Sequence, residues 1–184
     1  RTECAAAREA PTIGQAWCAP LVFVRRLTGS GGFARIAVME RNERDIVIKT
    51  YDFLSETARN IRTTVFVEEQ GFSYAAEFDD VDASSTHLVL LECGKPIATC
   101  RFFGQDDGVY AIGRIAALKE YRGSGMGAAA VRAAEKMIAA EGGRVALVHA
   151  QTRASGFYAK LGYEPFGEPD EDEGVPHVWM QRAL

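Results

Sequence analysis

The six residues from Arg122 to Gly127, Arg-Gly-Ser-Gly-Met-Gly, are the part of this sequence best suited to bind a phosphate. They stand between a predicted strand, residues 109–118, and a predicted helix that begins at Met126. Glycines allow backbone N–H groups to approach an anion closely, and the helix dipole favours a negative charge at that end. Arg122 adds a guanidinium, which suits phosphate. The loop therefore predicts a ligand that carries phosphate.

Two other phosphate motifs fit this loop poorly. A P-loop requires Gly-Lys-Ser/Thr at the start of the helix, and no lysine stands there. The dinucleotide fingerprint is met in spacing by Gly123, Gly125 and Ala128, but it also requires a carboxylate at the end of the next strand. That position holds His149-Ala150-Gln151, so the dinucleotide interpretation is disfavoured.

A third motif, Arg/Gln-x-x-Gly-x-Gly/Ala, is met by Arg122, Gly125 and Gly127. It is the pyrophosphate loop of the GNAT N-acetyltransferases. Residues 151–163 resemble the second motif of that family, Asn-x-x-Ala-x-x-Phe-Tyr-x-Lys-x-Gly-Phe, with Gln151 in place of Asn and Tyr163 in place of Phe. The resemblance runs from Ile46 to the C-terminus. Shorter segments resemble the ElaA-like group of small bacterial GNATs, namely residues 62–70, 77–82, 113–116, 149–151 and 175–177.

The resemblance implies a fold, a cosubstrate and an activity. The GNAT fold is α/β (α+β), with a mixed, mostly antiparallel sheet flanked by helices. The implied enzyme is an acyltransferase that moves an acetyl group from acetyl-CoA to an unidentified amine. The residues that the resemblance assigns to acetyl-CoA are Ile115, Ala116, Ala117, Arg122, Gly123, Ser124, Gly125, Met126, Gly127, Gln151 and Tyr158.

Three residues form the predicted catalytic set. In the resemblance, Tyr158 protonates the departing thiolate, and a tyrosine with its ordinary pKa near 10 is a reasonable acid for that step. Glu77 and His149 are our candidates for the base that takes the proton of the amine. Glu69 and Asp79 are further carboxylates that could serve as this base.

Each candidate base also has a purely structural interpretation. His149 follows a buried strand, at the end where α/β proteins usually bind ligands, but it could equally be a hydrogen-bonded packing residue. The acids of residues 77–82 could be a solvated loop, an amine site, or partners of Arg62 or Arg114. The acidic run of residues 168–173 is interpreted as solvated surface, with attraction of a cationic substrate as the alternative.

Two other functions stay open at this point. Arg62-x-x-x-Phe66, followed by acids at Glu77, Asp79 and Asp82, also resembles the acyl-homoserine lactone synthases, which share the fold. Those synthases do not usually carry the glycine loop and the Phe-Tyr helix this clearly. A GNAT-like module that binds CoA without catalysis is the other alternative.

The elements that would position these residues follow from hydrophobic spacing. Predicted strands cover residues 46–48, 87–91, 96–103, 109–118, 145–148, 164–166 and 177–182. Helices are predicted after Ser55, from Met126 to Gly142-Gly143, and over residues 152–161, each with a polar or glycine residue at an end. Residues 71–85 are predicted to form a loop.

Length and composition place the chain among ordinary globular proteins. It has 184 residues, 47% hydrophobic and 25% charged, and a formal net charge of −4. We therefore expect no nucleic-acid partner, and the absence of a long apolar run predicts no membrane span. Cysteines and histidines lie too far apart for a zinc pattern, so no metal is expected. The expected partner is a small-molecule or peptide amine, a homodimer is left open, and the lack of a signal peptide favours a cytoplasmic location.

The chain divides by composition near residue 44. Residues 1–44 are rich in Ala, Arg and Gly, and two apolar stretches, residues 21–24 and 36–39, flank Gly29-Ser30-Gly31-Gly32 and could form a hairpin. We therefore predict an N-terminal extension, residues 1–44, and an N-acetyltransferase (GNAT) domain, residues 45–184.

Overall fold

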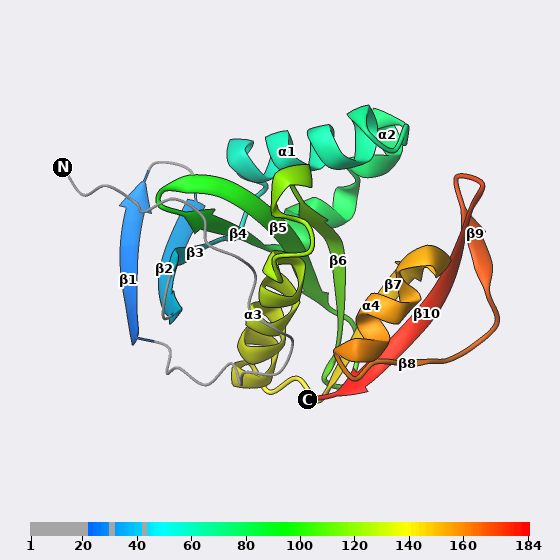
Figure 1. Cartoon of the computed structure of the whole chain (residues 1–184). Coiled ribbons are helices and arrows are strands. Elements are labelled where there is room, and N and C mark those ends of the chain that lie inside the picture. The colour runs from blue at the N-terminus through cyan, green and yellow to red at the C-terminus, as the bar shows by residue number, and fades with distance from the viewer. Residues whose placement is uncertain (1–21, 30–31, 42–43) are drawn as a thin grey trace.

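We describe the protein from a computed structural model, which defines residues 22–29, 32–41 and 44–184 (Figure 1). The strands are β1 (Val22–Gly29), β2 (Gly32–Arg41), β3 (Arg44–Tyr51), β4 (Thr86–Glu92), β5 (Lys95–Gly104), β6 (Val109–Ala117), β7 (Val145–Gln151), β8 (Glu164–Pro165), β9 (Asp170–Asp172) and β10 (Val175–Ala183). The α-helices are α1 (Glu56–Arg62), α2 (Tyr74–Glu77), α3 (Met126–Ala140) and α4 (Ser155–Lys160). A π-helix, Thr63–Glu68, continues α1.

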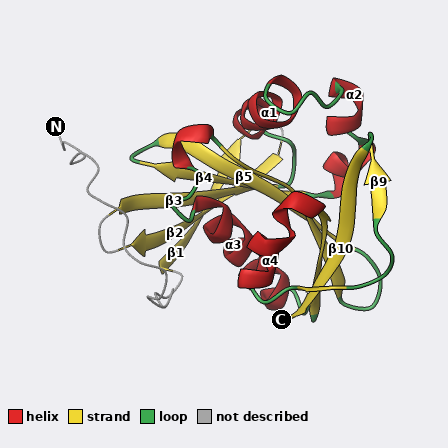
Figure 2. Ribbon diagram, turned by 45° about the vertical axis from the view of Figure 1, so that its right-hand side comes forward, coloured by secondary structure: helices red, strands yellow, loops and turns green. Residues whose placement is uncertain are grey.

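These strands form a single mixed sheet with helices on both faces (Figure 2). Their order is β1-β2-β3-β4-β5-β6-β7-β10-β8, and β9 pairs with β10. β6 and β7 are parallel, and the other described pairs are antiparallel. Helices α1 and α2 lie on one face, and α3 and α4 lie on the other. The predicted mixed, mostly antiparallel sheet flanked by helices is confirmed.

The centre of the sheet is buried on both faces because its strands carry apolar residues at successive positions. In β4, Leu88 and Leu90 belong to the hydrophobic cluster that contains α3. Val89 and Leu91, which point the opposite way, belong to the cluster that contains α1. Helices α3 and α1 therefore pack against opposite faces of the middle strands. The candidate site residues lie at the edge of this packed region.

Local signals in the sequence account for the starts of α1 and α3. The Ser55 hydroxyl accepts a hydrogen bond from the Ala58 N–H at 3.2 Å and so caps α1, as predicted. Gly125, the residue before α3, has φ of +86°, a left-handed conformation that favours glycine. Helix α3 therefore begins without a side-chain cap.

The parallel strands β6 and β7 separate partway along their length. They pair at three positions, the last of which joins Ala111 to Leu147. β6 then continues to Ala117 and β7 to Gln151 with no further pairing between them within residues 44–184. The two strands thus form a V, which is visible beside α4 in Figure 1. Among the described residues, the edges that face each other inside the V therefore have backbone groups that are not paired in a strand ladder.

The N-terminal strands belong to the same sheet as the rest. β1 pairs with β2, which pairs in turn with β3, so the segment around the glycine run forms a hairpin. The division into an extension and a domain at residue 44 stays a prediction. No helix in the described part of the chain is long and apolar enough to cross a bilayer.

Candidate active site

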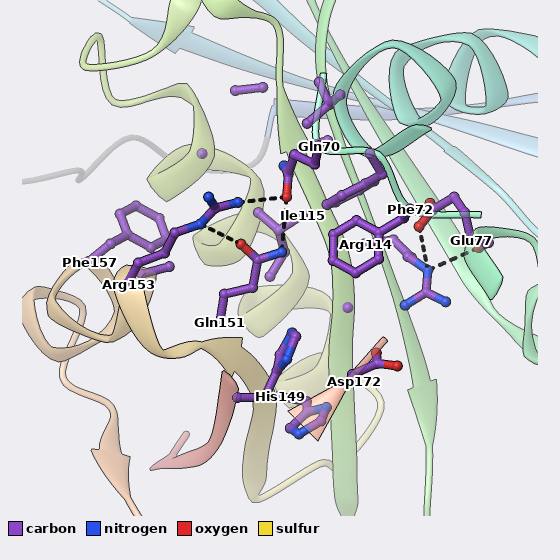
Figure 3. A pocket seen from close by; sticks show the side chains of 18 of the residues that line it. Gln70, Phe72, Glu77, Arg114, Ile115, His149, Gln151, Arg153, Phe157 and Asp172 are labelled. Carbon is purple, nitrogen blue, oxygen red and sulfur yellow. Dashed lines mark hydrogen bonds and ion pairs between the residues drawn. The ribbon is translucent and has the colours of Figure 1, made fainter. Parts of the chain in front are cut away.

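A cavity of about 360 Å³ lies in the V between β6 and β7 (Figure 3). Its walls come from both faces of the sheet, because α3 and α4 contribute residues on one side and the π-helix, α2 and β9 contribute residues on the other. Nine predicted site residues line it: Glu77, Ile115, Ala116, Ala117, Arg122, Gly127, His149, Gln151 and Tyr158. A chemical step in this cavity could therefore receive one reactant from each face.

The glycine loop reaches this cavity with its first and last residues, Arg122 and Gly127. Gly127 lines the wall, and a Cβ built on it would lie 3.5 Å from the Phe157 ring. The first N–H groups of α3 have no intrahelical partner, and Gly125 offers no side chain to satisfy them. This end of α3 therefore has backbone N–H groups without a side-chain cap, and their binding of an anion stays a prediction.

The other loop residues have different surroundings. Arg122 donates to the Glu69 carboxylate at 2.5 Å and to the Ala117 carbonyl at 3.0 Å, so its charge is already compensated. The Ser124 hydroxyl donates to the Tyr121 carbonyl at 2.6 Å. Met126 is buried in the core, and Gly123, Ser124 and Gly125 do not line the cavity.

Strand β6 bends where it leaves β7. Between its paired positions Gly113 and Ala116 it has one residue more than β5 has opposite, and Arg114 in this bulge has φ of +51°. The predicted residues Ile115, Ala116 and Ala117 follow directly and line the cavity. The bulge thus separates the paired part of β6 from the part whose edge is free.

Tyr158 lies on α4 and lines the cavity. Its side chain is 8% exposed and packs in the hydrophobic cluster of α3, with the Tyr163 ring 5.9 Å away. Burial raises the pKa of the Tyr158 hydroxyl well above its ordinary value, so the phenol keeps its proton at neutral pH. It is therefore a hydrogen-bond donor in the cavity wall.

Glu77 belongs to a buried cluster of three arginines and three carboxylates, which we call the arginine cluster: Arg62, Arg101, Arg114, Glu77, Asp79 and Asp82. Arg62 Nε lies 2.5 Å from Glu77 Oε1, and Arg114 Nε lies 3.1 Å from Oε2. Burial raises the pKa of the Glu77 carboxyl, against the opposing effect of these guanidinium groups. The alternative in which Arg62 pairs with these acids is confirmed, and the interpretation as a solvated loop is wrong for Glu77, Asp79 and Asp82, while Asp80 is exposed.

Asp79 and Asp82 complete the arginine cluster. Arg101 Nη1 contacts Asp79 Oδ1 at 2.5 Å and Asp82 Oδ1 at 2.6 Å. Burial opposes ionisation of both acids, but the hydrogen bonds from the arginines outweigh it and hold the pKa of each below its ordinary value. The segment predicted as a loop, residues 71–85, is therefore ordered by buried ion pairs and contains α2.

His149 points from β7 into the cavity, between Gln151 and Asp172 (Figure 3). Its Nε2 lies 2.7 Å from Asp170 Oδ1. The Trp179 ring stacks on the imidazole at a centroid distance of 4.5 Å and an angle of 19°. The ring is therefore both held by a hydrogen bond and packed.

The Gln151 side chain, which lines the cavity, is hydrogen-bonded to Gln70 in the segment that follows the π-helix. Its Nε2 donates to Gln70 Oε1 at 2.9 Å, and Arg153 donates to Gln151 Oε1 at 2.8 Å and to Gln70 Oε1 at 3.0 Å (Figure 3). The amide predicted to contact a cosubstrate thus uses one of its two N–H donors and one lone pair of its oxygen within the protein. Its second N–H and second lone pair have no partner among the described residues and could serve a ligand.

The hairpin of β9 and β10 covers the α2 side of the cavity. Glu173 accepts hydrogen bonds from the Ser73 N–H at 3.0 Å and from the Ser73 hydroxyl at 2.9 Å. The neighbouring Asp172 lines the cavity, and its side chain makes no hydrogen bond or ion pair with the described residues. The acidic run, interpreted as solvated surface, therefore also holds the hairpin against α2 and places one free carboxylate at the cavity.

Sequence reasoning missed several wall residues, namely Phe66, Gln70, Phe72, Arg153 and Asp172. Gln70 and Phe72 follow the π-helix, where the Glu69 N–H bonds to the Thr64 carbonyl five residues earlier. A π-helix is common near functional sites, but no local pattern in the sequence announces it. The acids on β9 belong to a charged run in which no single position stands out.

Comparisons with known proteins agree with this architecture. The profile of the acetyltransferase (GNAT) domain family matches residues 56–184. The N-acetyltransferase YjcF of Bacillus subtilis, which is uncharacterized, is 33% identical over 147 residues, covering 79% of this chain and 98% of YjcF. An N-acetyltransferase homologue from Lactobacillus plantarum has a crystal structure with a TM-score of 0.68 and 33% identity, covering 77% of this chain and 98% of that one.

More distant structures share the fold. Escherichia coli ElaA has a TM-score of 0.61 at 24% identity, over 68% of this chain and 87% of its own. A GNAT acetyltransferase from Elizabethkingia anophelis, solved with acetyl-CoA bound, has a TM-score of 0.61 at 12% identity, over 76% of this chain and 98% of its own. With the domain profile and the relatives at 33% identity, these likenesses place the chain in the GNAT acetyltransferase family, and the protein is an acyltransferase.

Proposed function

We propose that this protein transfers the acetyl group of acetyl-CoA to a primary amine of a small molecule or peptide, as an ElaA-like member of its family. The observation that supports this most is the cavity between β6 and β7, which brings an uncapped helix N-terminus, a free strand edge and Tyr158 together. The E. anophelis neighbour, which has this fold, was solved with acetyl-CoA.

The donor side of the cavity suits a pyrophosphate and an extended arm. The backbone N–H groups at the start of α3 would hold the pyrophosphate, and Arg122 contributes less than its charge suggests because Glu69 neutralises it. The free edge of Ile115, Ala116 and Ala117 would pair with the amides of the pantetheine arm, much as a neighbouring strand would. This arrangement directs the thioester toward Tyr158.

The chemistry at the thioester requires few protein groups. An N–H at the β6 edge would polarise the carbonyl, and the Tyr158 hydroxyl would donate a hydrogen bond to sulfur as the C–S bond breaks. The raised pKa makes Tyr158 a weaker acid than a free tyrosine, but it keeps the hydroxyl protonated, so the hydroxyl can donate a hydrogen bond to sulfur until the thiolate forms. Thiol release from acetyl-CoA by the purified protein, measured with a panel of amines, tests the proposal. CoA binding without transfer to any amine would instead support the non-catalytic module.

The helix-terminus assignment predicts that Gly127→Glu abolishes donor binding. The new carboxylate would fill the cavity beside the N–H groups and repel phosphate, while an acid in the first turn of a helix is itself favourable for stability. We expect CoA affinity, measured by calorimetry, to fall at least about 100-fold, which is about 2.7 kcal/mol. The melting temperature without ligand should stay close to that of the wild type.

Gly156→Glu is the matched control for this variant. Gly156 is the second residue of α4, as Gly127 is of α3, and a Cβ there would meet no atom within 4 Å. It does not line the cavity, so CoA affinity should be unchanged. Equal CoA affinity in Gly127→Glu and Gly156→Glu would refute the placement of the pyrophosphate at α3.

The acceptor side favours an amine that carries a second positive charge. Asp172 lies at the cavity with no side-chain partner in the part of the chain that the structure describes, on a hairpin held in place by Glu173 and Ser73. We expect Asp172→Asn to raise KM about fivefold for a diamine, the effect of an exposed ion pair of about 1 kcal/mol, and to leave KM for a monoamine unchanged. Glu171→Gln, on the opposite face of β9, is the control. Equal changes for the two acceptors would exclude Asp172 from acceptor recognition.

A further inference from the structure

The structure distinguishes the two candidates for the base that takes the proton of the amine. Both oxygens of Glu77 already contact guanidinium groups, Oε1 that of Arg62 and Oε2 that of Arg114, and the side chain is 4% exposed. Although burial raises the pKa of Glu77, a proton on its carboxyl would remove a counter-charge from the buried Arg62 and the half-buried Arg114, which is unfavourable. Glu77 is therefore better suited to hold the wall of the cavity than to accept a proton.

The imidazole of His149 has a different environment. One ring nitrogen, Nε2, lies 2.7 Å from Asp170 Oδ1, and the other, Nδ1, has no hydrogen-bond partner in the part of the chain that the structure describes. The ring also packs between Trp179, at a centroid distance of 4.5 Å, and His177, at 4.7 Å. These contacts restrict its rotation, so the free nitrogen keeps a fixed direction.

Asp170 on β9 can reach His149 on β7 because β10 lies between these strands and pairs with both. β9 pairs with β10 so that Asp170 lies opposite His177, and β10 pairs with β7 so that Trp179 lies opposite His149. Asp170 and Asp172 are two residues apart on β9 and so share a face, which is the face turned to the cavity. The aspartate thus crosses β10 to contact the imidazole.

We infer that Asp170 is a positioning residue for acetyl transfer: it accepts the Nε2–H of His149 and thereby leaves Nδ1 unprotonated to take the proton of the acceptor amine. A carboxylate that fixes the tautomer of a histidine base and stabilises the imidazolium is a recurring catalytic device. The inference rests on the proposed function, which it deepens by assigning the base.

The proton and electron balance of the step is complete with groups in the cavity. The lone pair of the neutral amine forms the N–C bond while the C–S bond breaks, and that electron pair leaves on sulfur. The amine proton passes to Nδ1 of His149, and the Tyr158 hydroxyl protonates the thiolate. Afterwards the imidazolium releases its proton to solvent, and Tyr158 regains one from solvent.

The tautomer of His149 tests the inference without any substrate. The full-length protein labelled with ¹⁵N-histidine would be examined by NMR at a pH where the imidazole is neutral, with His149→Gln to assign its signals. We expect a proton on Nε2 and none on Nδ1 in the wild type, and a mixture of the two tautomers in Asp170→Ala. A wild-type His149 with its proton on Nδ1 would overturn the inference.

Kinetics with acetyl-CoA and an accepted amine supply the second test. Asp170→Asn should lower kcat about 100-fold with KM for acetyl-CoA unchanged, because an asparagine can donate to Nε2 and so favour the wrong tautomer. Glu171→Gln, the next residue on β9, should keep wild-type kcat. Wild-type kcat in Asp170→Asn would refute the role of Asp170 while leaving the proposed function intact. If no amine is acetylated by the wild type, the proposed function fails, and the tautomer alone decides the inference.

Discussion

Tyr158→Phe should lower kcat at least about 100-fold and leave the affinity for acetyl-CoA nearly unchanged. The substitution keeps the ring that packs in the core and removes only the hydroxyl. Because the hydrogen bond to sulfur strengthens as the thiolate forms, its loss raises the barrier of the chemical step more than it weakens binding. Thiol release under saturating donor and amine measures kcat directly.

Tyr163→Phe is the control for this prediction. Tyr163 is as deeply buried as Tyr158 and belongs to the same hydrophobic cluster, but it does not line the cavity. Its variant should lose some stability and keep kcat. If Tyr158→Phe retained wild-type kcat with a verified acceptor, then a water molecule or another side chain would have to supply the proton.

Arg62→Met should destabilise the protein by about 3–5 kcal/mol, the usual cost of removing one partner from a buried ion pair. Arg62 is 1% exposed and contacts Glu77 through Nε and Asp82 through Nη1 at 2.7 Å. Methionine fills similar space but leaves both carboxylates short of a counter-charge. The loss should appear as a lower urea midpoint of unfolding.

The pH dependence of the stability difference between Arg62→Met and the wild type identifies the cause of this loss. The native pKa of Asp79 and Asp82 is lowered, so the stability that they contribute is present above the unfolded value, near 3.9, and disappears as pH falls through the native value. We therefore expect the difference between Arg62→Met and the wild type to narrow in acid. A difference independent of pH would indicate lost packing instead.

Arg59→Met provides the comparison within the same helix. Arg59 lies one turn before Arg62 and donates to the Tyr74 hydroxyl at 2.9 Å on the exposed side of α1. It contacts no carboxylate of the arginine cluster. We expect this variant to lose less than about 1 kcal/mol, at every pH.

The elements around the candidate site that the sequence predicts correctly are those encoded locally. The glycine loop at the start of α3 and the helix that carries Tyr158 each follow from a short pattern whose residues act within one or two turns. The alternation of apolar residues likewise predicts the strands that hold Ile115 and His149. Such features depend on backbone propensity and burial, which neighbouring residues determine.

The contacts between distant segments could not be predicted. Ser73 and Glu173 are 100 residues apart, and Gln70 and Gln151 are 81 residues apart. Each pair depends on how two elements meet after folding, and a charged or amide side chain has the same local appearance whether it is solvated or paired. For this reason the acidic run gave no sign that Asp170 would reach His149.

The V between β6 and β7 also divides the sheet mechanically. Three ladder pairs join β6 to β7, and beyond Ala111 and Leu147 no ladder pair connects these two strands within the described residues. A donor whose amides paired with the β6 edge would serve as a substitute strand and restore part of the missing ladder. Binding of such a donor would then make the connection between β6 and β7 more rigid. Release of CoA after the transfer would make this connection more flexible again in every catalytic cycle.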